Sequence, residues 1–150
     1  MHDPPTPTFS HFGICVSDLD RSLRFYCDGL GFEKAESHAI GHDFAALMDL
    51  PEVAGTSQFI RRGQLAIELL AFEDPAPFGD GERRPLNQLG LTHLSFRVGD
   101  LAATTARIVE HGGTVVETSR TNIELGPSQL QFVYCTDPDG VRIELMDLGA

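Results

Sequence analysis

Apolar and polar residues follow two different periods along this chain, and the same order of periods occurs twice. An alternating stretch near 10–16 is followed by apolar residues three or four positions apart, Leu19, Leu23, Tyr26 and Leu30. Alternation at every second residue is typical of a strand, whereas a spacing of three or four is typical of a helix. The pattern predicts a strand followed by a helix.

Residues that begin and end helices support this prediction in both places. Asp18 stands before the first helix and can cap it, and glycines follow from Gly29 onward. The second occurrence has a strand over 92–98, a cap at Asp100 and a helix that ends at Gly112. The two segments therefore agree in the type and order of their elements.

Two pairs of segments are also similar in amino-acid sequence. SHFGICVSDL at 10–19 and THLSFRVGDL at 92–101 share His, Val, Asp and Leu at matching positions. GQLAIELLAF at 63–72 and GVRIELMDL at 140–148 share the tripeptide Ile-Glu-Leu. Similar openings and similar endings predict an internal duplication.

Between these shared ends, the two copies differ in detail. The second copy predicts two strands with a loop between them, near 114–120 and 129–135. In the first copy we expect a strand near 32–39, a helical insert around 43–50 and a strand near 57–62. Each copy thus has the order βαβββ. The predicted fold is α+β, with two tandem βαβββ modules that form a cupped mixed sheet.

We expect one domain over 1–150, since this length suits a single core. Module one covers about 9–72 and module two about 91–148. The linker at 73–90 is rich in Pro and Gly, and we interpret it as an ordered crossing or lid.

Strand parity separates a core face from a second face. The first and last strands of both modules place apolar residues on one side: Phe12, Ile14, Val16, Leu65, Ile67, Leu69, Leu94, Phe96, Val98, Val141, Ile143 and Leu145. On the opposite side each of these strands carries one imidazole or carboxylate, namely His11, Glu68, His93 and Glu144.

Two interpretations of these four residues compete. Polar residues often occupy the solvated face of an antiparallel sheet without any function. Solvent would accept Lys, Thr, Gln or Ser equally well, however, and a His or Glu at all four matched places favours metal binding. Two imidazoles and two carboxylates suit one divalent ion such as Zn, Ni, Co, Mn or Fe, although they do not identify which.

Charge and hydropathy exclude several partners. The chain has 22 acidic and 11 basic residues, a formal charge of −11, so we expect no binding to nucleic acid or to an anionic membrane. No segment has the roughly 20 apolar residues of a membrane span, and the first residues do not resemble a signal peptide. By default this predicts a cytoplasmic protein.

The repeated motifs resemble the vicinal oxygen chelate superfamily, which includes glyoxalase I, methylmalonyl-CoA epimerase, extradiol dioxygenases, and fosfomycin and bleomycin resistance proteins. The resemblance covers nearly all of 9–148 and rests on HFGICVSDLDRSLRFYCDGLGF, IELL, GLTHLSFRVGDL and DPDGVRIEL. It implies a cupped sheet around a metal whose ligands lie on the first and last strands of each module. By position these are His11, Glu68, His93 and Glu144, in agreement with the parity argument.

The resemblance also implies a chemistry. A divalent metal that chelates vicinal oxygens of a small-molecule substrate would stabilise an enolate or enediolate, as an isomerase, epimerase or lyase requires. The implied catalytic bases are Glu144 and, as its counterpart, Glu68. Arg97 and Arg142 lie on the same faces as His93 and Glu144 and are predicted to hold a substrate carboxylate, with a salt bridge at the rim as the alternative.

Two further functions stay open. One is an extradiol-type dioxygenase with a His/His/Glu iron site, in which Glu68 would not coordinate. The other is a non-catalytic protein that binds a small molecule such as an antibiotic, which the presence of all four candidate ligands argues against. We expect a homodimer, whose modules pair either within a chain or between chains.

Overall fold

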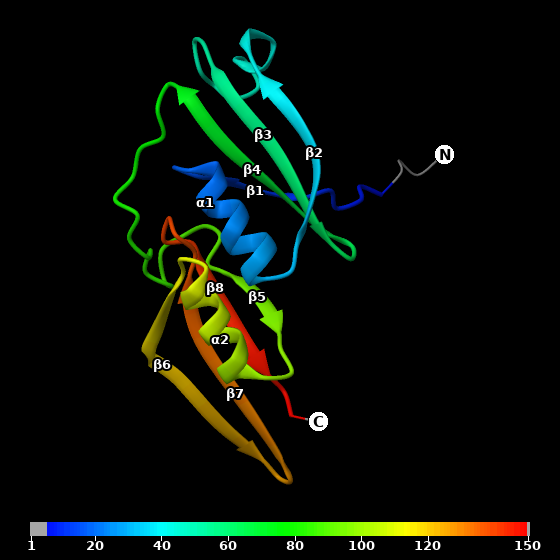
Figure 1. Ribbon diagram of the computed structural model, residues 1–150, viewed down its shortest axis with the longest axis vertical. Helices are drawn as coiled ribbons and strands as arrows, with labels where there is room; N and C mark the ends of the chain where they lie inside the picture. The colour runs from blue at the N-terminus through cyan, green and yellow to red at the C-terminus, as the bar shows by residue number, and fades with distance from the viewer. Residues whose placement is uncertain (1–5, 150) are drawn as a thin grey trace.

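The computed structural model describes residues 6–149 and places the two modules end to end in an elongated molecule (Figure 1). Each module has one four-stranded sheet, in the orders β1-β4-β3-β2 and β5-β8-β7-β6. The first and last strands of each module run parallel, whereas the other pairings are antiparallel. This is the α+β fold with two tandem βαβββ modules and mixed sheets that the sequence predicts.

Module one begins with its first strand and helix and continues through three strands. Its elements are β1 (Phe12–Cys15), α1 (Leu19–Leu23), a π-helical segment (Arg24–Gly29), β2 (Glu33–Ile40), a 3-10 turn (His42–Phe44), β3 (Ala54–Arg62) and β4 (Leu65–Asp74). The Asp18 side chain accepts a hydrogen bond from the Arg21 amide, 2.9 Å away, which confirms the predicted cap.

Module two follows the same order. Its elements are β5 (Leu94–Arg97), α2 (Leu101–Glu110), β6 (Thr114–Leu125), β7 (Ser128–Thr136) and β8 (Arg142–Asp147). Asp100 caps α2 by accepting from the Ala103 amide at 2.8 Å. The linker that joins the modules contains no helix or strand between β4 and β5.

Two local expectations are wrong. The segment predicted as a helical insert around 43–50 forms only the 3-10 turn and further turns, and Asp49 there has a positive φ of 56°. The predicted loop between the middle strands of module two shrinks to a tight turn at 126–127, because β6 extends to Leu125. Exposed residues such as Asn122 and Glu124 form this extension. Because no face of it is buried, the sequence there lacks the apolar alternation by which a strand is predicted.

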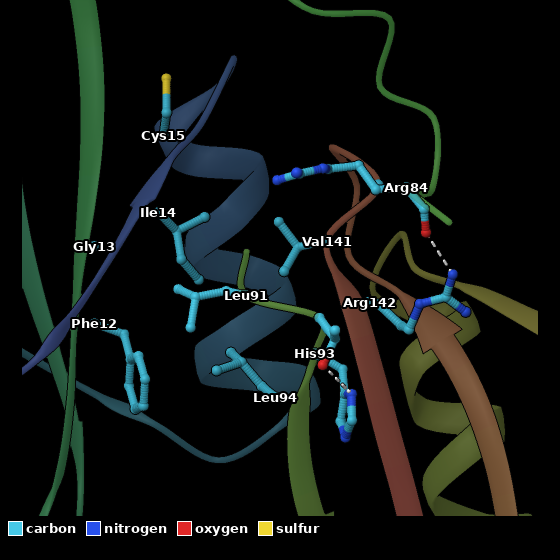
Figure 2. Close-up of a pocket in the computed structure, with 12 residues that line it drawn as sticks. Phe12, Gly13, Ile14, Cys15, Arg84, Leu91, His93, Leu94, Val141 and Arg142 are labelled. Carbon is cyan, nitrogen blue, oxygen red and sulfur yellow. Dashed lines mark hydrogen bonds between the residues drawn. The ribbon is translucent and has the colours of Figure 1, made fainter. Parts of the chain in front are cut away.

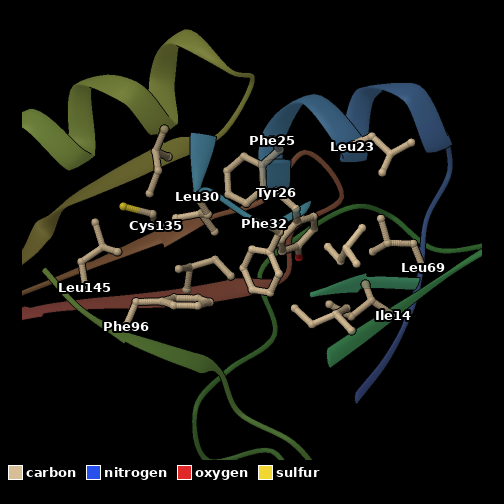
Figure 3. Close-up of a cluster of buried hydrophobic side chains, with 14 of the residues drawn as sticks. Ile14, Leu23, Phe25, Tyr26, Leu30, Phe32, Leu69, Phe96, Cys135 and Leu145 are labelled. Carbon is tan, nitrogen blue, oxygen red and sulfur yellow. The ribbon is translucent and has the colours of Figure 1, made fainter. Parts of the chain in front are cut away.

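The two modules share one apolar core, which lies between the helices and the sheets (Figure 3). Phe25, Tyr26 and Phe32 from module one lie at its centre, and Phe96 from β5 contacts Phe32 edge-on with ring centroids 6.0 Å apart. The predicted core face holds: Ile14, Val16, Ile67, Leu69, Phe96, Ile143 and Leu145 are buried, and the other residues of that set are half-buried. Residues of both modules therefore belong to one buried cluster.

Polar contacts at the turn before β8 strengthen the junction. The buried Tyr26 hydroxyl donates to Asp137 Oδ2 at 2.9 Å, and burial raises the pKa of both groups. Asp139 accepts from the Ser17 amide at 2.9 Å and forms an ion pair with Arg21 at 2.8 Å. The start of module one is therefore attached to the end of module two.

No helix among residues 6–149 is long and apolar enough to cross a membrane.

Candidate metal site formed by two His–Glu pairs

The first pair consists of His11, just before β1, and Glu68 on the adjacent strand β4. His11 Nε2 lies 3.2 Å from Glu68 Oε2, and both side chains are partly exposed on the face away from the core. The other ring nitrogen, Nδ1, lies 2.8 Å from Ser10 Oγ. The hydroxyl can accept a hydrogen bond from Nδ1–H, which favours the tautomer whose Nε2 lone pair is free to bind a metal.

Two residues of β3 surround this pair. The Ser57 hydroxyl donates to Glu68 Oε1 at 2.5 Å, a short bond of the kind that a carboxylate accepts. Phe59, which is opposite Glu68 in the ladder, contacts the His11 ring edge-on at 5.0 Å. Together they restrict the orientation of both members of the pair.

The second pair occupies the equivalent place in module two. His93 Nε2 lies 3.6 Å from Glu144 Oε2, and His93 Nδ1 lies 2.9 Å from Thr92 Oγ1. The Ser95 hydroxyl donates to Glu144 Oε2 at 2.7 Å. The two pairs thus share one plan: an imidazole and a carboxylate face each other, and a hydroxyl contacts each of them.

Tyr134 distinguishes the second pair from the first. It lies opposite Glu144 in the ladder, in the place that Phe59 has in module one, and its ring contacts His93 edge-on at 5.6 Å. Desolvation and the nearby Glu144 charge raise the pKa of Tyr134, so its hydroxyl stays protonated. The second pair therefore has a hydroxyl where the first has only a hydrocarbon ring.

Within one chain the structure does not bring the four predicted ligands together. It brings His11 to Glu68 and His93 to Glu144, but no three His, Cys, Asp or Glu side chains among residues 6–149 are grouped so that they could hold a metal ion. Each pair lies at an edge of its sheet, since β1 and β5 are the outermost strands. The described chain thus presents two separate His–Glu pairs, each of which we call a half-site.

The two arginines predicted to bind substrate have different surroundings. Arg142 stacks over Tyr134, with its guanidinium carbon 4.9 Å from the ring centroid, and its Nη2 donates to the main-chain oxygen of Arg84 at 2.6 Å. Burial, and to a smaller extent Arg83, lowers its pKa. Arg97 is exposed on β5, and its side chain makes no hydrogen bond or ion pair to any residue of 6–149.

A cavity of about 280 Å³ opens beside the second pair, between the start of β8 and β1 (Figure 2). His93 lines it together with apolar side chains of both modules, and Arg84 extends over Val141 toward β1. The linker thus contributes to the walls of the cavity through Arg84, and Leu91, which directly follows the linker, also lines it. An apolar cavity with few polar groups is the usual form of a small-molecule site.

Sequence reasoning missed the supporting residues Ser57 and Tyr134. They lie on β3 and β7, the middle strands, where the copies share no letters that could align them. Tyr134 pairs directly with Glu144 across the turn between β7 and β8, so a known register would have identified it. The register of a pairing, however, cannot be read from one strand alone.

Comparison with known proteins places these features in a family. The sequence profile described as "Glyoxalase/Bleomycin resistance protein/Dioxygenase superfamily" matches residues 8–145. The chain is 31% identical over 138 residues to the uncharacterized protein YaeR of Escherichia coli, covering 91% of this chain and 93% of YaeR. It is 32% identical over 140 residues to a probable lactoylglutathione lyase of Synechocystis, covering 93% and 95%.

Solved structures show the same fold. A glyoxalase family protein from Bacillus cereus superposes with a TM-score of 0.83 at 21% identity, covering 100% of this chain and 99% of that protein. The fosfomycin resistance protein FosX from Listeria monocytogenes, in complex with Mn(II) and sulfate, superposes with a TM-score of 0.58 at 17% identity, covering 95% and 93%.

Proposed function

Because this chain belongs to the glyoxalase/bleomycin resistance/dioxygenase superfamily, we propose that it is a divalent-metal-dependent enzyme of the glyoxalase or epimerase type. The observation that carries the proposal is the presence of two equivalent His–Glu pairs, each on the first and last strands of its module. The similarity to a probable lactoylglutathione lyase supports the same class of chemistry.

The donor atoms of these pairs fit a divalent transition metal. Two imidazole nitrogens and two carboxylates suit Zn, Ni, Co, Mn or Fe, and the hydroxyls at both Nδ1 atoms support the tautomer that binds metal through Nε2. His11, Glu68, His93 and Glu144 would hold it. When bound, such an ion supplies electrophilic stabilisation of negative charge on neighbouring substrate oxygens.

The protein's own groups would then move the proton. Glu144 would accept a proton from the substrate carbon next to a carbonyl, and Glu68 on the other pair would return one. Glu144 is the less restricted of the two, because His93 lies 3.6 Å away and His11 lies 3.2 Å from Glu68. A carboxylate that is held less tightly can reach toward the substrate more easily, which favours Glu144 as the base.

We further propose that the complete site forms between two chains. The half-sites lie at the free edges β1 and β5, and an exposed edge can join the edge of another copy. In a symmetric dimer, module one of each chain would face module two of its partner and yield two equivalent sites. Small substrates with vicinal oxygens would bind in the cup that results.

A complementation experiment tests the metal site and its assembly together. One variant carries His11→Ala and Glu68→Ala, and the other carries His93→Ala and Glu144→Ala. Each alone should bind no Mn, Co, Ni, Zn or Fe(II) above background, as measured by elemental analysis after dialysis, whereas the unmodified protein should hold about one ion per chain.

After the variants are mixed and refolded together, half of the random dimers contain one intact pairing. Metal binding should then return to about one ion per four chains if sites form between chains. If the mixture binds none, the sites form within a chain. If the unmodified protein binds none of these ions, the metalloenzyme proposal fails and a non-catalytic binding protein becomes the better interpretation.

A further inference from the structure

The cavity beside His93 has features that point to the kind of molecule it accepts. Its walls include Phe12 and Ile14 from module one and Leu91, Leu94 and Val141 from module two and the linker. At about 280 Å³ it is at the small end of ligand pockets, which suits a short apolar chain. His93 lies at one end and Arg84 reaches over the other side in Figure 2.

Two arginines line this cavity, Arg84 and Arg142, and like Arg62 and Arg107 they pair with no carboxylate of residues 6–149. Arg21, Arg61 and Arg120 each pair with a carboxylate, at 2.8, 3.2 and 2.5 Å. The Arg84 guanidinium contacts only neutral oxygens, Gln88 Oε1 at 3.3 Å and the main chain of Leu89 at 3.2 Å, and no carboxylate of residues 6–149 pairs with it. The chain has 22 acidic residues, and an arginine that pairs with none of them can bind an anion from solution.

The main chain of Arg84 is held in place from two sides. Arg142, stacked on Tyr134, donates to its carbonyl oxygen at 2.6 Å. The preceding residues of the linker contact the turn before β8, where Gly140 approaches the main chain of Gly81. Arg84 therefore starts from a fixed position at the cavity, which lowers the entropic cost of binding.

We propose that this cavity binds a short apolar carboxylic acid, with its carboxylate on Arg84 and its chain against Leu91, Leu94 and Val141. The proposal deepens the proposed function and rests on it for the identity of the site. The opposite end of such a substrate would lie toward His93, which lines the cavity. It assigns the substrate class as an acid with its reacting oxygens separated from its carboxylate by an apolar segment.

The test uses hexanoate and hexan-1-ol as probes, which share a chain and differ in charge. Binding is followed through the NMR shifts of Leu94 and Val141 in the full chain, with a chelator present so that no metal contributes. We expect hexanoate to bind about tenfold more tightly than the alcohol, and this preference to shrink as salt is added.

Arg84→Gln should abolish the preference and leave hexan-1-ol binding unchanged, whereas Arg84→Lys should retain part of it. Arg120→Gln is the matched control, because it removes one positive charge from an exposed position on β6. Arg84 lies on the exposed linker, and circular dichroism would verify that its variants fold.

The proposal is overturned if hexanoate does not bind, if Arg84→Gln keeps the preference, or if Arg120→Gln loses it equally. Because the titration excludes metal, its result is independent of the proposed function. Loss of metal binding with normal hexanoate binding would reject the enzyme proposal alone, and the reverse would reject only the carboxylate subsite.

Discussion

The two half-sites have the same plan but different surroundings. In both, an imidazole just before the first strand faces a carboxylate on the last strand. Around the first pair the neighbours are Phe59 and Ser57, whereas Tyr134 and Arg142 lie around the second. The features common to both copies are the proposed metal ligands, and the features that differ provide a polarity with which one side of a substrate could be distinguished from the other.

Even the supporting hydroxyl has a different origin in each copy. Glu144 accepts from Ser95, its direct neighbour on β5, while the equivalent neighbour of Glu68 on β1 is Gly13. In module one the hydroxyl comes from the opposite side, from Ser57 on β3. The requirement is thus a hydrogen bond to the carboxylate, and the strand that donates it is free to change.

The largest expected effect is the loss of bound metal, and it should be the same for a ligand substitution in either half-site. His11→Ala and His93→Ala each remove one ligand, so each should reduce bound metal from about one ion per chain to background. Elemental analysis measures this, with His42→Ala on the exposed 3-10 turn as the control. Retention of metal in either ligand variant would show that the corresponding half-site does not coordinate.

A second prediction concerns the core on which both half-sites rest. Phe25 is fully buried, and Phe25→Ala should destabilise the protein by about 3–5 kcal/mol through lost burial and a new cavity. Urea unfolding followed by circular dichroism should show one transition, because the modules share that core. The same substitution at the fully exposed Phe78 should change the unfolding free energy by less than about 0.5 kcal/mol. Two separate transitions would contradict a shared core.

The hydroxyls permit a more precise comparison. Ser57→Ala should weaken metal binding about tenfold, because Glu68 loses the bond that orients it. Adding Gly13→Ser should restore part of the affinity, since a Cβ at Gly13 would lie 4.0 Å from Glu68 Oε2 and make only an ordinary van der Waals contact with Leu70 Cδ1 at 3.9 Å. Metal titration of the single and double variants measures this. If Gly13→Ser restores no metal affinity, the strand that donates the hydroxyl to Glu68 is not interchangeable.

The smallest effect should come from exchanging the aromatic residues. Tyr134→Phe makes the second half-site resemble the first, and Phe59→Tyr does the reverse. Both should alter the unfolding free energy by less than about 1 kcal/mol, since neither hydroxyl is buried in the core. We expect Tyr134→Phe to lower kcat/KM, once a substrate is found, and Phe59→Tyr to have little effect. Equal effects would mean that the two pairs are functionally alike.

Much of this architecture could be predicted because it is duplicated. The matched His, Glu and capping Asp residues occur twice, and parity alone separates Ile14 and Ile67 from His11 and Glu68. The middle strands share no such matched residues. The sequence therefore predicts β6 too short and a helix around 43–50 that the structure does not contain. Whether four ligands meet depends on how whole modules are placed, which local periodicity does not encode. The metal-binding roles of all four residues remain a prediction.

One contact described above ties the outer linker to the inner site. At Gly140 the backbone has a φ of 87°, and any side chain would collide with the Gly81 carbonyl oxygen. A methyl group there would have to displace the linker segment that precedes Arg84 or shift the turn itself, whose Asp137 and Asp139 attach it to module one. Position 140 is therefore the point at which one added side chain would alter the wall of the cavity and the junction of the modules together.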